Sequence, residues 1–309
     1  MTRTQRSAHA QQAAQPRRPL HWGRALAWLV LGLFILLSVF PLLWMLRTAL
    51  TPAADIFDSP GNLLPAHASA INFERVLGRL SLEQAQAAGG SGASIDFLHY
   101  LRNTVIVMVL TVTGQVACSV LAAYAFARLE FPLKNLIFTL FLGVLMVPGI
   151  VTLIPNFILI RDLGWLNSFL GIVAPFFLFA PVSIFFMRQY FLGQSREIEE
   201  AARIDGAGTF TIFWRVALPM AVPGISTLAL INALGAWGEY LWPLLAGRGE
   251  ETRTLTVALS VFRQQSPSGV PDFTGLMAAS SVAILPIFFL LVILGRRMLD
   301  SLGGFSGLK

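Results

Sequence analysis

Charged residues are scarce in this sequence of 309 residues, and their scarcity excludes an ordinary soluble domain. They make up 12% of the chain, whereas soluble domains contain about 25%. Hydrophobic residues make up 55% of the chain, and the mean hydropathy is +0.69. This composition is typical of a protein that lies largely within a membrane.

Cysteine and lysine are almost absent, and each absence removes a class of chemistry. The single cysteine, Cys118, cannot form an intramolecular disulfide. The two lysines, Lys134 and Lys309, do not follow a glycine, so the chain has no phosphate-binding loop of the GxxxxGK[ST] type. We therefore expect this chain to bind no cofactor and not to bind ATP by that route.

Catalytic and metal-binding constellations are also lacking. No grouping of His, Ser and Asp within the apolar stretches favours an intramembrane enzyme. No carboxylate interrupts these stretches, although proton-coupled carriers usually place one inside the membrane. We expect a non-catalytic protein with no catalytic residue and no metal site.

Six long apolar stretches dominate what is present. Each has more than 20 residues without a formal charge, which is long enough for a helix to cross a hydrocarbon core about 30 Å thick. A buried helix of a soluble protein explains one such stretch but not six. We predict an all-α polytopic membrane protein with six transmembrane helices over Ala25–Leu46, Asn103–Ala127, Asn135–Ile160, Leu163–Met187, Val216–Gly238 and Phe273–Gly295.

The distribution of basic residues orients these spans. Six spans leave both termini on one side, and that side carries 14 of the 22 Lys and Arg residues. Basic short loops remain in the cytoplasm, so we expect cytoplasmic N- and C-termini. The net charge of +6 then reflects membrane topology and predicts lipid, not nucleic acid, as the surrounding partner.

The spans divide the chain into segments of different expected character. The linker composition of Leu82–Ser94 predicts a mobile insert. The expected segments are a disordered cytoplasmic tail (1–24), a first span (25–46), a periplasmic loop (47–102), a five-span core with a loop at 195–219 (103–298) and a cytoplasmic C-terminal tail (299–309).

A charged island, Ser195–Pro219, separates the fourth and fifth apolar stretches. Six of the ten residues 196–205 are charged. Ser195 fits a helix N-cap, and the acidic residues after it favour the positive end of a helix dipole. Gly206 and Gly208 fit the end of that helix, with Gly206 at a turn of positive φ. We predict a short helix, a turn and a second helical segment leading back into the membrane.

The spacing in the island resembles the cytoplasmic signature of permease subunits of bacterial ATP-binding-cassette (ABC) importers. It consists of Glu200-Ala201-Ala202, then Gly206, then Val216-Ala217-Leu218-Pro219, with Val216 where the family has Ile. Most of the chain resembles the carbohydrate-uptake branch, specifically the maltose-type second permease subunit. The segments that carry this likeness include FPLLWMLRTAL, LAAYAFARLEF, VPGIVTLIPNFILIRDLGWLNS and NALGAWGEYLWPLL.

The resemblance implies a function and a set of partners. Such a permease forms a heterodimer with a second permease subunit, and together they make the pathway for a mono- or oligosaccharide across the bacterial inner membrane. A dimer of ATPase subunits holds ATP and Mg, and a periplasmic or lipid-anchored sugar-binding protein delivers the sugar. The signature forms a coupling helix against the ATPase, a contact that the resemblance assigns to Glu199, Glu200, Ala201, Ala202, Asp205, Gly206, Leu218 and Pro219.

One face of the fifth apolar stretch is a candidate lining for the pathway. Polar and small residues recur there every three or four positions, which places them on one side of a helix. Tyr240 fits equally a ring stacked on a sugar and an aromatic belt at the membrane interface, while the belt is favoured for Trp242. The predicted pathway residues are Asn232, Gly235, Trp237, Glu239 and Tyr240.

Two alternatives remain open at this point. The first is an ABC importer permease for a non-sugar solute, such as a polyol or glycerol phosphate. The second is a self-contained secondary carrier or channel, whose charged island is a regulatory loop. Dependence on a separate ATPase distinguishes the second alternative from any ABC importer.

Overall fold

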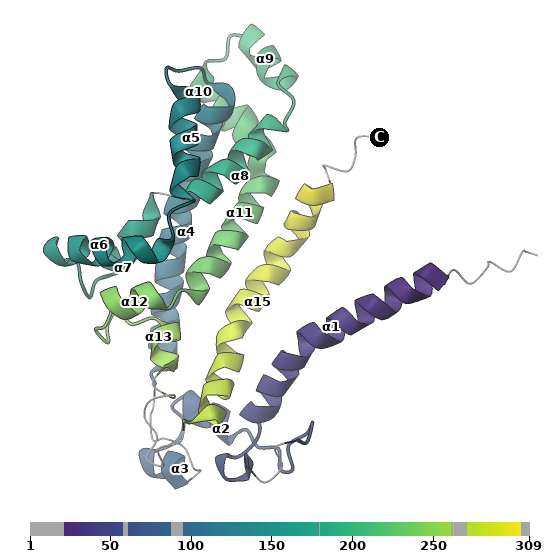
Figure 1. Cartoon of the computed structure of the whole chain (residues 1–309), viewed down its shortest axis with the longest axis vertical. Coiled ribbons are helices and arrows are strands. Elements are labelled where there is room, and N and C mark those ends of the chain that lie inside the picture. Colours follow the sequence, from purple (N-terminus) through teal and green to yellow (C-terminus); the bar gives the residue numbers. More distant parts are fainter. Residues whose placement is uncertain are drawn as a thin grey trace, which may run out of the picture. The chain divides into compact units, whose positions relative to one another are not determined.

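The computed structural model describes residues 22–57, 61–87, 95–178, 180–260, 262 and 271–303, and every regular element within them is helical. The chain divides into two compact units, residues 1–45 and 46–309. In the labels of Figure 1 the elements are α1 (Trp22–Ala49), η1 (Ala53–Asp55), α2 (Ile71–Val76), α3 (Leu82–Ala87), α4 (Phe97–Arg128), α5 (Lys134–Val144), α6 (Gly149–Asp162), α7 (Phe169–Phe177), α8 (Pro181–Leu192), α9 (Glu197–Ile204), α10 (Thr209–Ile212), a π-helical turn η2 (Phe213–Ala217), α11 (Leu218–Gly238), α12 (Leu241–Ala246), α13 (Leu255–Leu259) and α15 (Phe273–Gly303).

The number of spans agrees with the predicted multi-pass, all-α fold. Among the described residues, four helical runs are long and apolar enough to cross a membrane: α1, α4, α15 and the continuous run Thr209–Gly238 made by α10, η2 and α11. The number rises to six when the bent pairs α5–α6 and α7–α8 each count as one span. The chain is therefore a multi-pass membrane protein.

The third and fourth predicted spans are strongly bent, as the prolines within them allow. The predicted span Asn135–Ile160 is divided into α5 and α6, which meet at 95°. Pro148 lies at this break and carries no N–H to continue the helical ladder. α5 and α6 measure about 17 and 21 Å, so neither alone crosses a core about 30 Å thick. Leu163–Met187 is likewise divided into α7 and α8, bent by 46°, with Pro181 at the start of α8.

Several segment boundaries also differ from those expected. α1 begins at Trp22, inside the tail assigned to 1–24, of which residues 1–21 lie outside the described residues. Part of the expected mobile insert is helical as α3, while residues 88–94 lie outside the described part. α15 continues to Gly303, beyond the start expected for the C-terminal tail at 299, and residues 304–309 are not described.

α4 is the central helix of the second unit. It packs against α7, α8 and α11, as Figure 1 shows. It begins at Phe97, not at 103, because the Asp96 side chain accepts a hydrogen bond from the His99 N–H at 3.0 Å and caps the helix. Gly114 lies so close to the ring of Phe177 that a Cβ there would overlap it. This close approach is how small residues bring helices together in a membrane.

A buried ion pair ties α2 to the start of α15. Arg75 donates from both terminal nitrogens to Asp272, at 2.7 and 3.0 Å, and both side chains are at most 3% exposed. Asn72 accepts from Arg75 and donates to the carbonyl oxygens of Ala49 and Thr51, each at 2.8 Å. The network therefore joins three segments that are far apart in the sequence.

Breaking this pair on one side should destabilise the fold strongly. Arg75→Met leaves the Asp272 carboxylate buried without its cation, which typically costs about 3–5 kcal/mol. We expect the detergent-solubilised protein to unfold at a clearly lower denaturant concentration, measured by far-UV circular dichroism. The double variant Arg75→Met, Asp272→Asn should recover much of the loss.

The matched control is Arg79→Met, which removes the same charge from an exposed position of the same segment. Equal destabilisation by Arg79→Met and Arg75→Met would contradict a special role for the buried pair.

Candidate functional sites: an exposed helix–turn–helix and a polar cavity

The predicted island is a short helix–turn–helix between α8 and the run that contains α11. Its first helix, α9, begins at Glu197, and the Ser195 hydroxyl accepts a hydrogen bond from the Glu197 N–H at 3.2 Å. α9 ends at Ile204, and Gly206, two residues later, has a φ of +88°, as the sequence predicted. The chain then continues through Gly208, in extended conformation, into α10. In Figure 1, α9 lies at the end of the second unit that is opposite to α2 and α3.

The outer surface of this helix–turn–helix is apolar at several points and is not covered by the chain. Ile198 is 49% exposed, Ile204 is 87% exposed and Phe210 is 75% exposed. Exposed apolar clusters with polar residues around them commonly mark protein interaction sites. The sequence analysis did not single out Ile204 or Phe210, although both are large apolar residues within the charged island.

One acidic residue of α9 points inward and holds the helix in place. Glu199 is 7% exposed. Its carboxylate accepts hydrogen bonds from Arg128 Nε at 2.7 Å and from the Tyr124 hydroxyl at 3.3 Å. Arg128, the last residue of α4, also donates to the Gln194 carbonyl oxygen at 3.0 Å. Two helices that are far apart in the sequence are thus joined by a buried ion pair.

The structure separates the residues that the resemblance had grouped as one contact. Glu199 faces Arg128, so its side chain belongs to the attachment of α9 and not to its outer surface. Ala202 and Leu218 are half-buried. The exposed members of the set are Glu200, Ala201, Asp205, Gly206 and Pro219.

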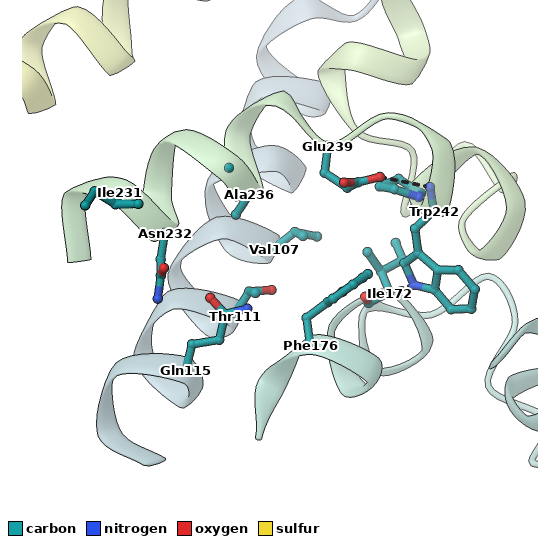
Figure 2. A pocket seen from close by; sticks show the side chains of 12 residues that line it. Val107, Thr111, Gln115, Ile172, Phe176, Ile231, Asn232, Ala236, Glu239 and Trp242 are labelled. Carbon is teal, nitrogen blue, oxygen red and sulfur yellow. Dashed lines mark hydrogen bonds between the residues drawn. The ribbon is translucent and has the colours of Figure 1, made fainter. Parts of the chain in front are cut away.

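A cavity of about 230 Å³ lies among α4, α7, α11 and α12. Three predicted pathway residues line it, namely Asn232, Gly235 and Glu239. Trp237 and Tyr240 are not among its lining residues. Figure 2 shows Asn232, Thr111 and Gln115 on one side of the cavity, and the rings of Phe176 and Trp242 on the other.

Asn232 is already engaged in a contact between helices. Its amide exchanges hydrogen bonds with the Ser183 hydroxyl of α8 at 3.2 and 3.3 Å. Ser183 is 4% exposed, so this polar contact is shielded from solvent. Asn232 therefore holds α11 against α8 at the edge of the cavity.

Glu239 lies where α11 ends and the chain turns into α12. Its Oε1 accepts a hydrogen bond from the Trp242 N–H at 3.1 Å, and its carbonyl oxygen accepts one from the Thr256 hydroxyl at 2.9 Å. These contacts fix the backbone and one carboxylate oxygen. Figure 2 shows the carboxylate at the cavity.

The aromatic-belt interpretation of Trp242 is wrong. Trp242 is 4% exposed, and its indole N–H donates to the carbonyl oxygens of Ile172 and Gly171 at 3.1 and 3.3 Å. It lines the cavity together with Phe176, whose ring centroid lies 6.2 Å away. Tyr240, for which the two interpretations were weighted equally, is 39% exposed and lies outside the cavity lining.

Sequence reasoning missed the contribution of α4 to this cavity. Thr111 and Gln115 lie one turn apart on α4 and both line it. A polar pair at i, i+4 within an otherwise apolar stretch was the available signal. No group of three or more His, Cys, Asp or Glu residues in the described part of the chain could hold a metal ion.

Comparison with known proteins assigns the chain to a family. Residues 115–301 match the family described as binding-protein-dependent transport system inner membrane component. The chain is 32% identical over 289 residues to the probable ABC transporter permease protein YurM of Bacillus subtilis, covering 93% of this chain and 90% of that protein.

Two further relatives carry named substrates. The chain is 29% identical to NgcG, a permease protein of the diacetylchitobiose uptake system of Streptomyces coelicolor, covering 90% of this chain and 86% of NgcG. It is 30% identical to UgpE, a permease protein of the sn-glycerol-3-phosphate transport system of Yersinia pestis, covering 87% of this chain and 91% of UgpE.

A solved structure shares the fold over nearly the full length. One chain of a bacterial ABC transporter involved in the import of the acidic polysaccharide alginate is 25% identical, with a TM-score of 0.73. The match covers 92% of this chain and 98% of that chain. With the family match and the relatives, the conclusion is direct: the chain belongs to the family of inner membrane permease components of binding-protein-dependent ABC importers.

Proposed function

We propose that this chain carries a mono- or oligosaccharide inward, as one half of a heterodimeric pathway, and that α9 couples it to an ATPase. The exposed apolar surface of a helix that a buried ion pair locks onto the central helix α4 supports this proposal most directly. The choice of a sugar as the transported solute is supported by the names of NgcG and of the alginate importer.

The proposed partners follow from the family. A second permease subunit completes the pathway, and a periplasmic or lipid-anchored binding protein delivers the sugar. A dimer of ATPase subunits holds ATP and Mg and contacts the exposed residues of α9 and its turn, while this chain performs no catalysis. In this arrangement both termini and α9 lie in the cytoplasm, which the distribution of basic residues supports.

The transport of glycerol phosphate is the second candidate function, because UgpE is as similar to this chain as the sugar permeases are. The two candidates share the fold and the coupling contact. They differ in the charge of the solute, which a transport assay can distinguish.

Transport in reconstituted vesicles tests the proposed function. We expect uptake of a labelled sugar only when vesicles contain this chain, the second permease, the ATPase with ATP and Mg, and the binding protein. Uptake by this chain alone would contradict the importer assignment and favour a self-contained carrier. Uptake of sn-glycerol 3-phosphate in preference to every sugar would favour the second candidate.

A side chain at Gly206 should uncouple ATP hydrolysis from uptake without preventing membrane insertion. Gly206→Val places a branched side chain at a φ of +88°, which costs about 1–2 kcal/mol or more for a residue other than glycine. A strain of about 1.4 kcal/mol lowers the population of the native turn about tenfold relative to its alternatives, so we expect sugar uptake per ATP hydrolysed to fall clearly.

Gly208→Val is the matched control for this change. Gly208 has a φ of −69° and open space at its Cβ position, so valine fits there without strain. Normal uptake by Gly206→Val, or equal loss in both variants, would count against the proposed role of the Gly206 turn.

Removing the charge of Glu199 should detach α9 while leaving its outer surface unchanged. Glu199→Gln leaves Arg128 buried without its anion, and breaking such a pair typically costs about 3–5 kcal/mol. We expect trypsin to cleave after Arg203 at least about tenfold faster, because local opening exposes the segment, and we expect coupled uptake to fall.

Glu197→Gln provides the comparison, since it makes the same charge change at an exposed position of α9. Its cleavage rate should stay near that of the unmodified protein. Equal cleavage rates in Glu199→Gln and Glu197→Gln would show that the buried pair does not hold α9.

A further inference from the structure

We propose that the cavity beside Glu239 is a subsite for one neutral sugar unit, and that the Glu239 carboxylate excludes anionic solutes from it. This inference rests on the proposed function, because it specifies which solutes the pathway admits. It goes beyond that function by assigning substrate selection to a named residue of this subunit.

Glu239 is held so that one carboxylate oxygen remains available to the cavity. Oε1 accepts a hydrogen bond from the backbone N–H of Trp242. Oε2 has no hydrogen-bond partner among the described residues. The Thr256 hydroxyl donates a hydrogen bond to the Glu239 carbonyl oxygen, and this bond restrains the backbone that carries the carboxylate. A carboxylate oxygen accepts hydrogen bonds from sugar hydroxyls, and bonds to a charged acceptor are stronger than those to a neutral one.

Two polar side chains of α4 face the same cavity and are free to complete such a site. Neither the Gln115 amide nor the Thr111 hydroxyl makes a side-chain hydrogen bond with any described residue, and both line the cavity. Figure 2 shows them across the cavity from Glu239. The amide can donate and accept, which suits hydroxyl groups that do both.

The opposite wall provides apolar surface for a sugar ring. Phe176 and Trp242 line this wall, and the two hydrogen bonds of the Trp242 indole fix its orientation. The cavity volume of about 230 Å³ is below the about 300–1,000 Å³ of most small-molecule pockets. The size therefore favours one sugar unit at a time over a whole oligosaccharide.

The charge of the lining disfavours anions. Among the twelve lining residues Glu239 alone is ionisable, and none is Lys or Arg. Sites that bind phosphate or carboxylate usually provide Arg, Lys or free N–H groups at a helix terminus. Here the backbone N–H of Trp242, at the start of α12, already donates a hydrogen bond to the Glu239 carboxylate. An entering anion would meet a fixed like charge without compensation.

Equilibrium binding to the assembled transporter, without ATP, tests this inference separately from coupling. The probes are glucose, arabinose and diacetylchitobiose as neutral sugars, and glucuronate and sn-glycerol 3-phosphate as anions, detected by saturation-transfer NMR. We expect binding of at least one neutral probe and of neither anion. Glu239→Gln should raise the affinity for the anions at least about tenfold, since it removes the repulsion, and should weaken neutral binding.

Glu250→Gln is the matched control, because Glu250 is an exposed carboxylate outside the cavity lining. It should leave the ratio of neutral to anionic binding unchanged. Equal binding of both classes by the unmodified complex, or an unchanged ratio in Glu239→Gln, would overturn the proposal. So would the absence of neutral binding, as expected if a side chain of the second permease fills the cavity. Each of these results is compatible with ATP-dependent uptake in the vesicle assay, so the failure of this inference can be distinguished from the failure of the proposed function.

Discussion

A buried ion pair between Glu199 and Arg128 makes the exposed helix α9 a rigid extension of α4. Burying two charges is costly, and the cost is offset only when their hydrogen bonds are well satisfied. Tyr124 and the Gln194 carbonyl oxygen supply two of those bonds. The same helix α4 carries the cavity residues Thr111 and Gln115 near its middle, so a displacement of α9 would be transmitted through α4 to a wall of the cavity.

The pair of Arg75 and Asp272 performs the corresponding task for α2 and α15. Hydrophobic contact gives little drive for helices to associate in lipid, because lipid tails are as apolar as the side chains. Small residues such as Gly114 and specific polar contacts must therefore fix the arrangement. This explains why a chain with so few charges uses two of its acidic residues in buried pairs.

Local features of the fold could be predicted from the sequence, and features set by distant contacts could not. The turn at Gly206 depends on its immediate neighbours, and its positive φ was predicted correctly. The burial of Glu199, in contrast, depends on Arg128, 71 positions earlier, so nothing near it distinguishes it from the exposed acids of α9. Pro148 lacks the N–H that continues a helix and so allows a bend, but the angle of that bend depends on packing. Trp242 was misassigned because a buried and an interfacial tryptophan look alike in one sequence.

The π-helical turn Phe213–Ala217 fixes the rotational phase between α10 and α11. Within it the Leu218 N–H donates to the Phe213 carbonyl oxygen, five residues back, so this turn holds one residue more than an α-helical turn. Each residue rotates a helix by about 100°. Loss or gain of one residue in this turn would rotate α11, so that Asn232 would no longer face Ser183 and the α11 residues that line the cavity would point elsewhere. The length of this π-helical turn therefore determines which residues of α11 face α8 and the cavity.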